Sequence, residues 1–310
     1  LTGLIGGIYI GKSRRKIVYT NMYKVILLSY GSPERIEDVP EYLSGIFNGK
    51  KVPENILNEN IEKYRMVNGK SPSNEIIKNI MDKLSRLLNK YGDFEVTDAY
   101  KHWKPGIEET VESLNNEYES VIALPLFAFK SNNVSKSYEI PFKKAILPKN
   151  VDYKFINGLD DEMFTYAWIK NISKYIYDYD SFLFTAHSLP LIDDETDYIN
   201  SLHKYADKIS KILGIKSYYT AFYSQGPYGK WIEPSIYSLI DKFRADGIKN
   251  IAVVPLGFLY EHLEILYDLD VKYKEFLAEN GIEYVRAKTP SCSDELIILL
   301  KNVILKNLEK

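Results

Sequence analysis

Short apolar runs alternate along the chain with segments of helical periodicity, and this alternation constrains the fold more than any other feature. The apolar runs occupy residues 25–30, 94–100, 121–129, 182–187, 217–224 and 251–259. Residues 73–92, between two of these runs, repeat apolar side chains at three- and four-residue spacing, as an amphipathic helix does. Strands separated by helices in this way predict an α/β fold with parallel sheets covered by helices.

The two halves of the chain repeat the same order of features. Each half has an apolar run that enters a polar loop ending in proline, then a tryptophan and a proline before a helix, then Pro-Leu within another apolar run. The matching segments are 27–33 and 184–190, 102–105 and 229–234, and 123–129 and 253–259. We therefore predict two similar α/β domains that face each other across a cleft, at residues 22–160 and 161–290.

The two ends of the chain are predicted to lie outside these domains. In residues 1–21 the basic side chains follow an apolar stretch, whereas in a secretory signal they precede it. We expect residues 1–21 to be an extension outside the fold, with a membrane-touching or partner-binding arm as the alternative. Residues 291–310 contain an amphipathic segment with Ser293 as a candidate N-cap, and we expect a helix there that packs back on the body.

Composition and charge exclude several classes of protein. A net charge of -2 and a pI near 6.2 give no general attraction to nucleic acid, which is therefore not an expected partner. Cys292 is the only cysteine, which excludes an intramolecular disulfide and a multi-cysteine metal site and favours a reducing cytoplasm. No apolar run approaches the roughly 18–20 residues of a spanning helix, so we expect at most peripheral membrane contact.

His187 stands where an apolar run gives way to a loop, in a chain that has only four histidines. In open parallel sheets, ligands bind beyond the carboxyl ends of the strands. Tyr30 and the segment after Leu259 follow other predicted strands in the same way, so we expect all three in the cleft. Of the other histidines, we expect His102 to be structural, His203 to lie at the surface and His262 to pack on a helix, with a role in the cleft as the alternative.

Residues 259–276 carry a candidate acidic partner for this histidine. If they form a helix, Glu261, Glu264 and Asp268 fall on one stripe and His262 points away from it. The alternative is a solvated helix face, on which Asp268 pairs with a lysine four residues later. A neutral imidazole opposite carboxylates suits divalent metal binding or proton abstraction.

Several segments together resemble the ferrochelatases, which insert ferrous iron into a porphyrin in haem biosynthesis. The segments are 26–33, 64–72, 183–190, 231–234 and 251–270. The resemblance extends from Met22 to the C-terminus, and it implies two Rossmann-like halves with the porphyrin between them.

The resemblance also implies what the chain binds. Porphyrin and ferrous iron are the expected substrates, haem-pathway enzymes are expected partners, and no cofactor is expected to be permanently bound. Some ferrochelatases carry an iron–sulfur cluster on a cysteine-rich C-terminus, which this chain lacks, so no iron–sulfur cluster is expected. The alternatives are a cobalt or nickel chelatase acting on sirohydrochlorin and a non-catalytic porphyrin or haem carrier.

Carried over by resemblance, the catalytic residues are His187 and Glu264. His187 is expected to accept pyrrole protons and to be an iron ligand, and Glu264 to assist in metal capture or proton removal. Asp268 is expected to extend this polar path toward solvent as a further metal ligand. Porphyrin contacts are expected from Tyr30, Lys63, Tyr64, Ser71 and Tyr138, with ordinary packing as the alternative explanation for each.

The substrate prediction depends on Tyr30. A tyrosine before the glycine of 27-LLSYGSP-33 resembles the ferrochelatases that act on coproporphyrin III, and protoporphyrin IX is the alternative substrate. The chain departs from those relatives at Phe47 and Asn48, where they have an arginine pair, and at Lys272, where they have an acidic residue. Recognition of the porphyrin carboxylates would then pass to lysine. The candidates are Lys50, Lys51, Lys63 and Lys130.

Overall fold

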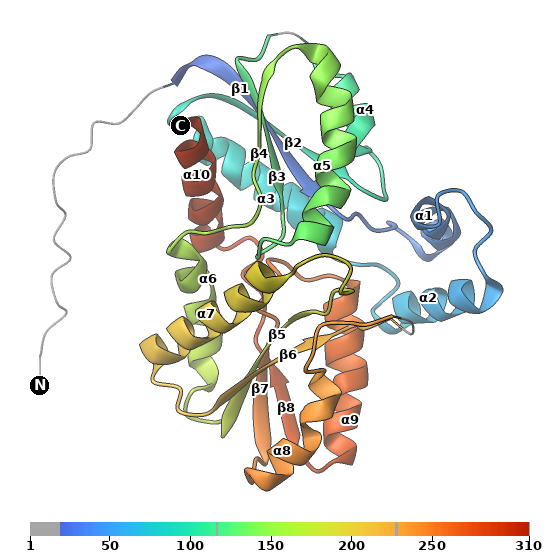
Figure 1. Cartoon of the computed structure of the whole chain (residues 1–310), viewed down its shortest axis with the longest axis vertical. Helices are drawn as coiled ribbons and strands as arrows, with labels where there is room; N and C mark the ends of the chain where they lie inside the picture. The colour runs from blue at the N-terminus through green and yellow to red at the C-terminus, as the bar shows by residue number, and fades with distance from the viewer. Residues whose placement is uncertain (1–18, 116, 227–228, 310) are drawn as a thin grey trace, which may run out of the picture.

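The computed structural model describes residues 19–115, 117–226 and 229–309, which form two four-stranded parallel sheets, one in each half (Figure 1). The first sheet contains β1 (Tyr19–Ser29), β2 (Gly92–Tyr100), β3 (Ser120–Pro125) and β4 (Asp152–Phe155). The second contains β5 (Ser181–His187), β6 (Tyr218–Tyr223), β7 (Asn250–Val254) and β8 (Glu283–Arg286). The strand orders β2-β1-β3-β4 and β6-β5-β7-β8 give both halves the same topology. The predicted fold of two similar Rossmann-like domains is confirmed.

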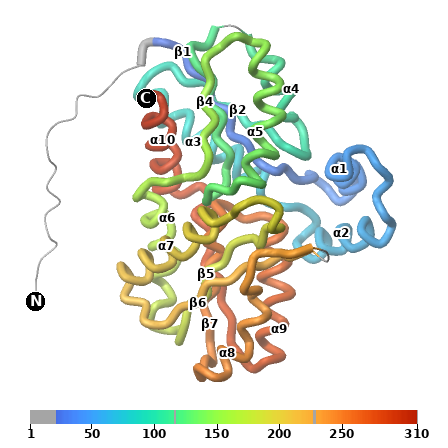
Figure 2. Tube along the Cα trace, viewed as in Figure 1, coloured from blue at the N-terminus to red at the C-terminus, as the bar shows by residue number. Residues whose placement is uncertain are grey.

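Helices cover both faces of each sheet. The first half contains α1 (Val39–Ile46), α2 (Glu54–Met66), α3 (Ser73–Leu88), α4 (Ile107–Glu112) and α5 (Asn132–Ile146). The second contains α6 (Met163–Ile172), α7 (Thr196–Leu213), α8 (Ile240–Ala245), a π-helix (Ile265–Tyr273), α9 (Lys274–Glu279) and α10 (Asp294–Leu308). Figure 2 shows that α1 and α2 lie to one side of the first sheet, apart from the layered body.

Alternate residues of the central strands enter different core clusters. In β1, Val25 and Leu27 belong to the cluster that contains α3, whereas Ile26 and Leu28 belong to the one that contains α4 and α5. This is the period of two that a strand imposes on its side chains. All four side chains are fully buried, which explains the continuous apolar run.

The C-terminal helix α10 returns from the second half of the chain to the first. It packs against α6 and α3, and Figures 1 and 2 show it beside α3. The Lys83 ammonium of α3 donates to the Cys292 carbonyl just before α10, at 2.7 Å. The largest core cluster runs through both halves, so the domain boundary between residues 160 and 161 stays a prediction. No described helix is both long and apolar enough to span a membrane.

The structure corrects the sequence prediction at the first strand. Strand β1 begins at Tyr19, so the predicted extension over residues 1–21 was wrong for its last three residues. These three residues precede the strongly apolar part of β1 and are too few to show an alternation of apolar and polar side chains. The rest of the predicted extension, residues 1–18, lies outside the described residues.

Candidate active site

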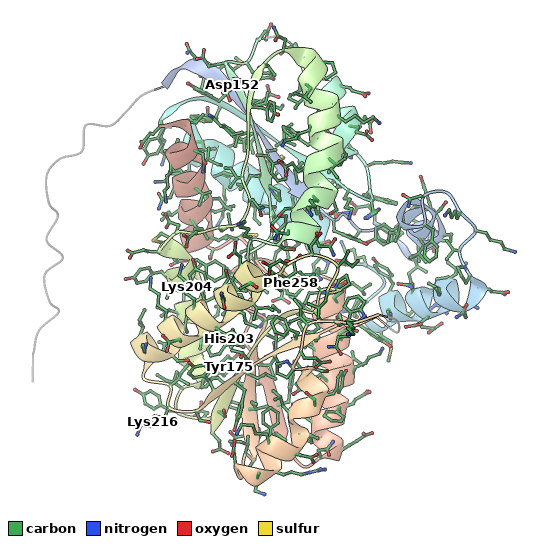
Figure 3. All side chains as sticks on the ribbon, in the orientation of Figure 1. Asp152, Tyr175, His203, Lys204, Lys216 and Phe258 are labelled. Carbon is green, nitrogen blue, oxygen red and sulfur yellow. The ribbon has the colours of Figure 1, made fainter. Side chains whose placement is uncertain are left out.

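A pocket of about 960 Å³ lies between the carboxyl ends of β1 and β5, where the two halves face each other. This volume is at the upper end of the roughly 300–1,000 Å³ typical of small-molecule sites. The first half lines it with Tyr30, Tyr42, Lys63, Tyr64, Lys101 and Tyr138. The second half lines it with His187, Tyr223, Ser224, His262, Glu264 and Asp268. Phe258, also part of the lining, is labelled at the junction of the two halves in Figure 3.

His187 is the last residue of β5, and its ring is fixed at both nitrogens. Nδ1 is hydrogen-bonded to the Ser188 carbonyl oxygen, so Nδ1 carries the proton. In the neutral ring Nε2 then carries the lone pair, and in the protonated ring it carries an N–H that faces Glu264 Oε1 at 3.6 Å. Burial alone would lower the pKa of His187, but the charge of Glu264 and the two hydrogen bonds raise it above its ordinary value. The predicted pairing of His187 with Glu264 in the cleft is therefore present.

The pKa values of Glu264 and Asp268 are shifted in opposite directions. Desolvation would raise the pKa of Glu264, but His187, His262 and Lys63 outweigh it and lower the pKa to about 2. Burial raises the pKa of Asp268, although its carboxylate accepts a hydrogen bond from the Ser224 hydroxyl. Glu264 is the N-cap of the π-helix, and Asp268 lies in its first turn.

Glu261 does not belong to the acidic row, contrary to the sequence prediction. Helical structure begins at Leu263, not Leu259, so Glu261 precedes the helix and points elsewhere. Its carboxylate pairs with Arg286 at 2.9 Å and accepts from the Thr289 backbone N–H at 2.8 Å. Arg286 also binds both carboxylate oxygens of Asp270, at 2.7 Å each. This network attaches the π-helix and the loop before it to the end of β8.

His262 was predicted to point away from the acidic residues, and this was also wrong. Its Nδ1 lies 3.9 Å from Glu264 Oε2, and its ring packs on Phe258 with centroids 4.3 Å apart. Burial lowers the pKa of His262 to about 4, so the ring is neutral at pH 7. Its Nε2 is buried and has no hydrogen-bond partner among the described residues. Periodicity misplaced His262 because the helix starts after it.

The first half contributes a wall of tyrosines, with Lys63 and Lys101 among them. Tyr30 follows β1 and keeps 43% of its surface exposed, whereas Tyr64 and Tyr138 are buried. Burial raises the pKa of Tyr30 to about 12, with a further contribution from the negative charge of Glu264. The Tyr30 ring lies against His102, with centroids 4.6 Å apart. All of these phenols are therefore neutral at pH 7.

Every residue predicted to contact the porphyrin lies in the lining of this pocket. Lys63 extends from α2 and pairs with Glu59 at 2.9 Å, and Ser71 is buried and hydrogen-bonds the Ser73 hydroxyl at 3.0 Å. Their contact with a porphyrin stays a prediction. His203, labelled on α7 in Figure 3, is exposed, in agreement with its expected surface position.

The sequence prediction missed Lys101, a partly buried lysine in the pocket lining. Lys101 directly follows β2, and its ammonium lies 5.8 Å from the Tyr30 ring centroid and 5.5 Å from that of Tyr138. Burial lowers the pKa of Lys101, and within the described part of the chain it has no carboxylate partner. Of the lysines expected to recognise carboxylates, Lys63 lines the pocket, and Lys130 pairs instead with Asp197 at 2.6 Å. The strand-end rule, applied to the run ending at residue 100, would have found Lys101.

Two further lining residues at the end of β6 were not singled out from the sequence. Tyr223 is 1% exposed, and its hydroxyl has no hydrogen-bond partner among the described residues. Ser224 has a left-handed backbone, with φ of 60°, and donates to Asp268. The same strand-end rule marks both positions, since the predicted run 217–224 ends there.

The site offers nitrogen and oxygen ligands for a divalent metal ion. His187 Nε2, which offers a lone pair when the ring is neutral, faces ionised Glu264, and the two are a donor pair that suits a first-row metal. Within the described ranges, no group of three or more histidine, cysteine or acidic side chains is close enough together to hold a metal ion. The metal-binding role of Asp268 therefore stays a prediction.

Comparison with known proteins places the chain in a family. The Ferrochelatase family model matches residues 24–308. The chain belongs to the ferrochelatase family. It is thus a metal chelatase, an enzyme that inserts a metal ion into a porphyrin in haem synthesis.

Curated relatives match over nearly the whole chain. The ferrochelatase of Thermoplasma acidophilum is 42% identical over 280 residues, which are 89% of this chain and 88% of the relative. The ferrochelatase of Thermoplasma volcanium is 41% identical, covering 90% and 91%. The coproporphyrin III ferrochelatase of Halalkalibacterium halodurans is 30% identical, covering 92% and 96%.

Solved structures share the fold at low sequence identity. The sirohydrochlorin chelatase SirB of Bacillus subtilis subspecies spizizenii, in complex with cobalt, has a TM-score of 0.54 at 10% identity, covering 93% of this chain and 96% of that chain. CbiX, described as the terminal enzyme of sirohaem biosynthesis in denitrifying bacteria, has a TM-score of 0.55 at 10% identity, covering 92% and 99%. At these identities the likeness concerns the fold alone.

Proposed function

We propose that this chain inserts Fe²⁺ into coproporphyrin III, with His187 as the proton acceptor. The observation that carries the proposal is the pairing of His187 Nε2 with Glu264 at 3.6 Å in a pocket whose opposite wall contains Tyr30. Tyr30 is the residue by which the chain resembles coproporphyrin III ferrochelatases. Several curated relatives of that name, at 28–30% identity, agree with this choice.

The reaction exchanges two pyrrole N–H protons for one Fe²⁺ ion, so the site must accept protons and tolerate a dication. His187 Nε2 takes a proton because Nδ1 already donates to the Ser188 carbonyl. Glu264 remains ionised at all working pH values, since its pKa is lowered to about 2, and it balances the charge of the imidazolium and of the incoming metal. Asp268, with its raised pKa, is the next proton acceptor on the path toward solvent.

Lys101 supports a substrate that carries carboxylates. Its ammonium is partly buried in the lining, is held between two aromatic rings and has no acidic partner in the described ranges. A buried cation without a counter-charge is costly, and a substrate propionate would supply that charge. Lys63 is a weaker candidate because Glu59 already neutralises it.

The proposal is tested by anaerobic absorbance of the wild-type protein with Fe²⁺ and, in parallel, coproporphyrin III, protoporphyrin IX and sirohydrochlorin. We expect the fastest metal insertion with coproporphyrin III. Faster insertion into protoporphyrin IX would overturn the substrate and leave the family reaction intact. Turnover of sirohydrochlorin alone would replace the proposal with a cobalt or nickel chelatase, and tight binding without turnover would indicate a carrier.

A further inference from the structure

The first turn of α5 is completed by a carboxylate from the other half of the molecule. The first N–H groups of any helix lack partners within the helix. In α5, the Ser131 hydroxyl accepts from Val134 N at 3.0 Å, as an ordinary N-cap does. The N–H groups of Asn132 and Asn133 donate instead to Glu195, at 3.2 and 2.7 Å. Glu195 directly precedes α7, and Figure 1 shows the starts of α5 and α7 meeting where the two halves face each other.

Glu195 is unusual in its burial. It is 3% exposed and is the only acidic residue among the described ones that is buried. A carboxylate removed from water is unfavourable unless hydrogen bonds satisfy it. The two backbone N–H groups and the positive end of the α5 dipole do so here. This arrangement is stable only while α5 and α7 keep their present separation.

The same segment reaches the catalytic histidine. The Tyr198 hydroxyl, three residues after Glu195, donates to the backbone carbonyl of His187 at 2.9 Å. On the other side of the contact, α5 carries Tyr138 into the pocket lining. Glu195 thus lies between the element that holds His187 and the element that carries part of the tyrosine wall.

Other bonds across this contact are exposed and contribute less. Lys136 pairs with Asp193 at 2.8 Å and Lys130 with Asp197 at 2.6 Å, and three of these four side chains are 48–63% exposed. Exposed pairs of this kind contribute little to stability. Of the groups across this contact, Glu195 is therefore the one whose removal should weaken the contact most.

We propose that Glu195 is a positioning residue that sets the separation between the α5 wall of the pocket and His187, and so prepares the pocket for the macrocycle. The proposal rests on the porphyrin chemistry proposed above. Glu195 lies outside the pocket lining and does not touch the reacting atoms. Its effect is expected on substrate affinity, because it fixes the width of the space that the porphyrin enters.

The test is Glu195→Gln, which keeps the shape of the side chain but replaces one acceptor oxygen with an N–H₂ group that faces an N–H donor. We expect the porphyrin KM to rise about tenfold with kcat within about threefold of wild type, because the pocket is no longer held at its working width. We also expect the amides of Asn132 and Asn133 to exchange with deuterium about tenfold faster. The control is Asp207→Asn, which removes the same charge from the exposed Asp207–Lys211 pair of α7 and should change neither quantity.

A second variant approaches the same contact from the α5 side. Asn132 is the first residue of α5, where proline is tolerated, so Asn132→Pro leaves Glu195 intact but removes one N–H donor to it. The substitution also removes the exposed hydrogen bond from the Asn132 side chain to the Asp194 carbonyl, at 2.6 Å. We expect a smaller rise in porphyrin KM of the same kind, about threefold. This variant tests the proposal independently if Glu195→Gln fails to fold.

The outcomes separate the positioning role from its alternatives. Faster exchange at the α5 amides with an unchanged KM would show that Glu195 merely stabilises the helix and would overturn the proposal. A fall in kcat at constant KM would indicate a smaller folded fraction and would also overturn it. If the wild-type protein bound no porphyrin at all, the proposed function itself would fail, whatever the exchange data show.

Discussion

The two halves of the molecule have the same strand order but opposite chemistry at the same topological position. Strand β1 ends at Ser29 and is followed by Tyr30, whereas the equivalent strand β5 ends on His187. Both walls of the pocket contain tyrosines, but both lining histidines lie in the wall that follows β5, together with Glu264 and Asp268. The acidic residue of the wall that follows β1, Glu59, is paired with Lys63. One sheet topology therefore presents two unlike surfaces to one pocket.

Under the proposed function, this difference separates porphyrin binding from metal insertion. A flat aromatic macrocycle needs an apolar surface with few polar groups, which the tyrosines and Lys101 provide. Proton removal and metal capture suit an imidazole and carboxylates with shifted pKa values, and His187, Glu264 and Asp268 all lie in the second half. Changes to the second wall should thus reduce turnover, and changes to the first wall should reduce affinity.

The largest expected effect comes from His187→Ala. Removal of the proton acceptor should lower the rate of metal insertion by about a thousandfold, while porphyrin affinity stays within about threefold of wild type. Anaerobic insertion kinetics and quenching of porphyrin fluorescence measure the two quantities. His203→Ala is the matched control, since His203 is exposed and its hydrogen-bond partner among the described residues is Thr220, at 3.1 Å. A parallel loss of porphyrin affinity and turnover would contradict the division of binding and chemistry between the two walls.

Arg286→Met tests how the catalytic wall is held. The substitution leaves Glu261 and Asp270 without their shared cation, and breaking such a partly buried network should cost about 3 kcal/mol of unfolding free energy. Urea titration measures this change. Arg244→Met, which breaks an exposed pair with Asp241 and an exposed hydrogen bond to Asn280, is expected to cost less than about 1 kcal/mol. Equal effects of the two substitutions would show that the network does not support the wall.

The smallest expected effect is that of Lys101→Gln, on the binding wall. Loss of the ammonium should raise the KM for coproporphyrin III about tenfold and leave kcat nearly unchanged, because a carboxylate contact is lost away from the reacting nitrogens. The effect should shrink with a porphyrin that has fewer propionates, such as protoporphyrin IX. Steady-state kinetics with both substrates measure it, and Lys130→Gln serves as the control. A fall in kcat instead of a rise in KM would indicate that Lys101 acts in the chemical step and not in substrate binding.

Residues at strand ends were predictable from the sequence, and residues whose place depends on helix phase were not. His187 and Tyr30 follow long apolar runs, so the strand-end rule placed both in the cleft. Glu261 and His262 were misplaced because the prediction assumed α-helical turns from residue 259, whereas the chain first makes a loop and then a π-helix. Lys101 directly follows the run that ends at residue 100, so the strand-end rule could have marked it, but its place against the rings of Tyr30 and Tyr138 depends on tertiary packing.

Short strands were also beyond the sequence pattern. Strands β4 (DYKF) and β8 (EYVR) have four residues each and mix charged with aromatic side chains. Each lies at an edge of its sheet and pairs with one neighbouring strand. An edge strand of this length has too little alternation to distinguish it from a loop.

The most direct test of the account is the pH dependence of kcat/KM for metal insertion, measured for the wild-type protein and for Glu264→Gln. His187 accepts a proton only when neutral, so kcat/KM should fall as pH drops through the pKa of His187, which Glu264 raises above its ordinary value. Glu264 itself does not titrate in this range, since its pKa is lowered to about 2. Removal of its charge lowers the pKa of His187, so the account predicts that the acid limb of the Glu264→Gln profile moves to lower pH. An acid limb that stays in place or moves to higher pH would contradict the assignment of His187 as the proton acceptor paired with Glu264.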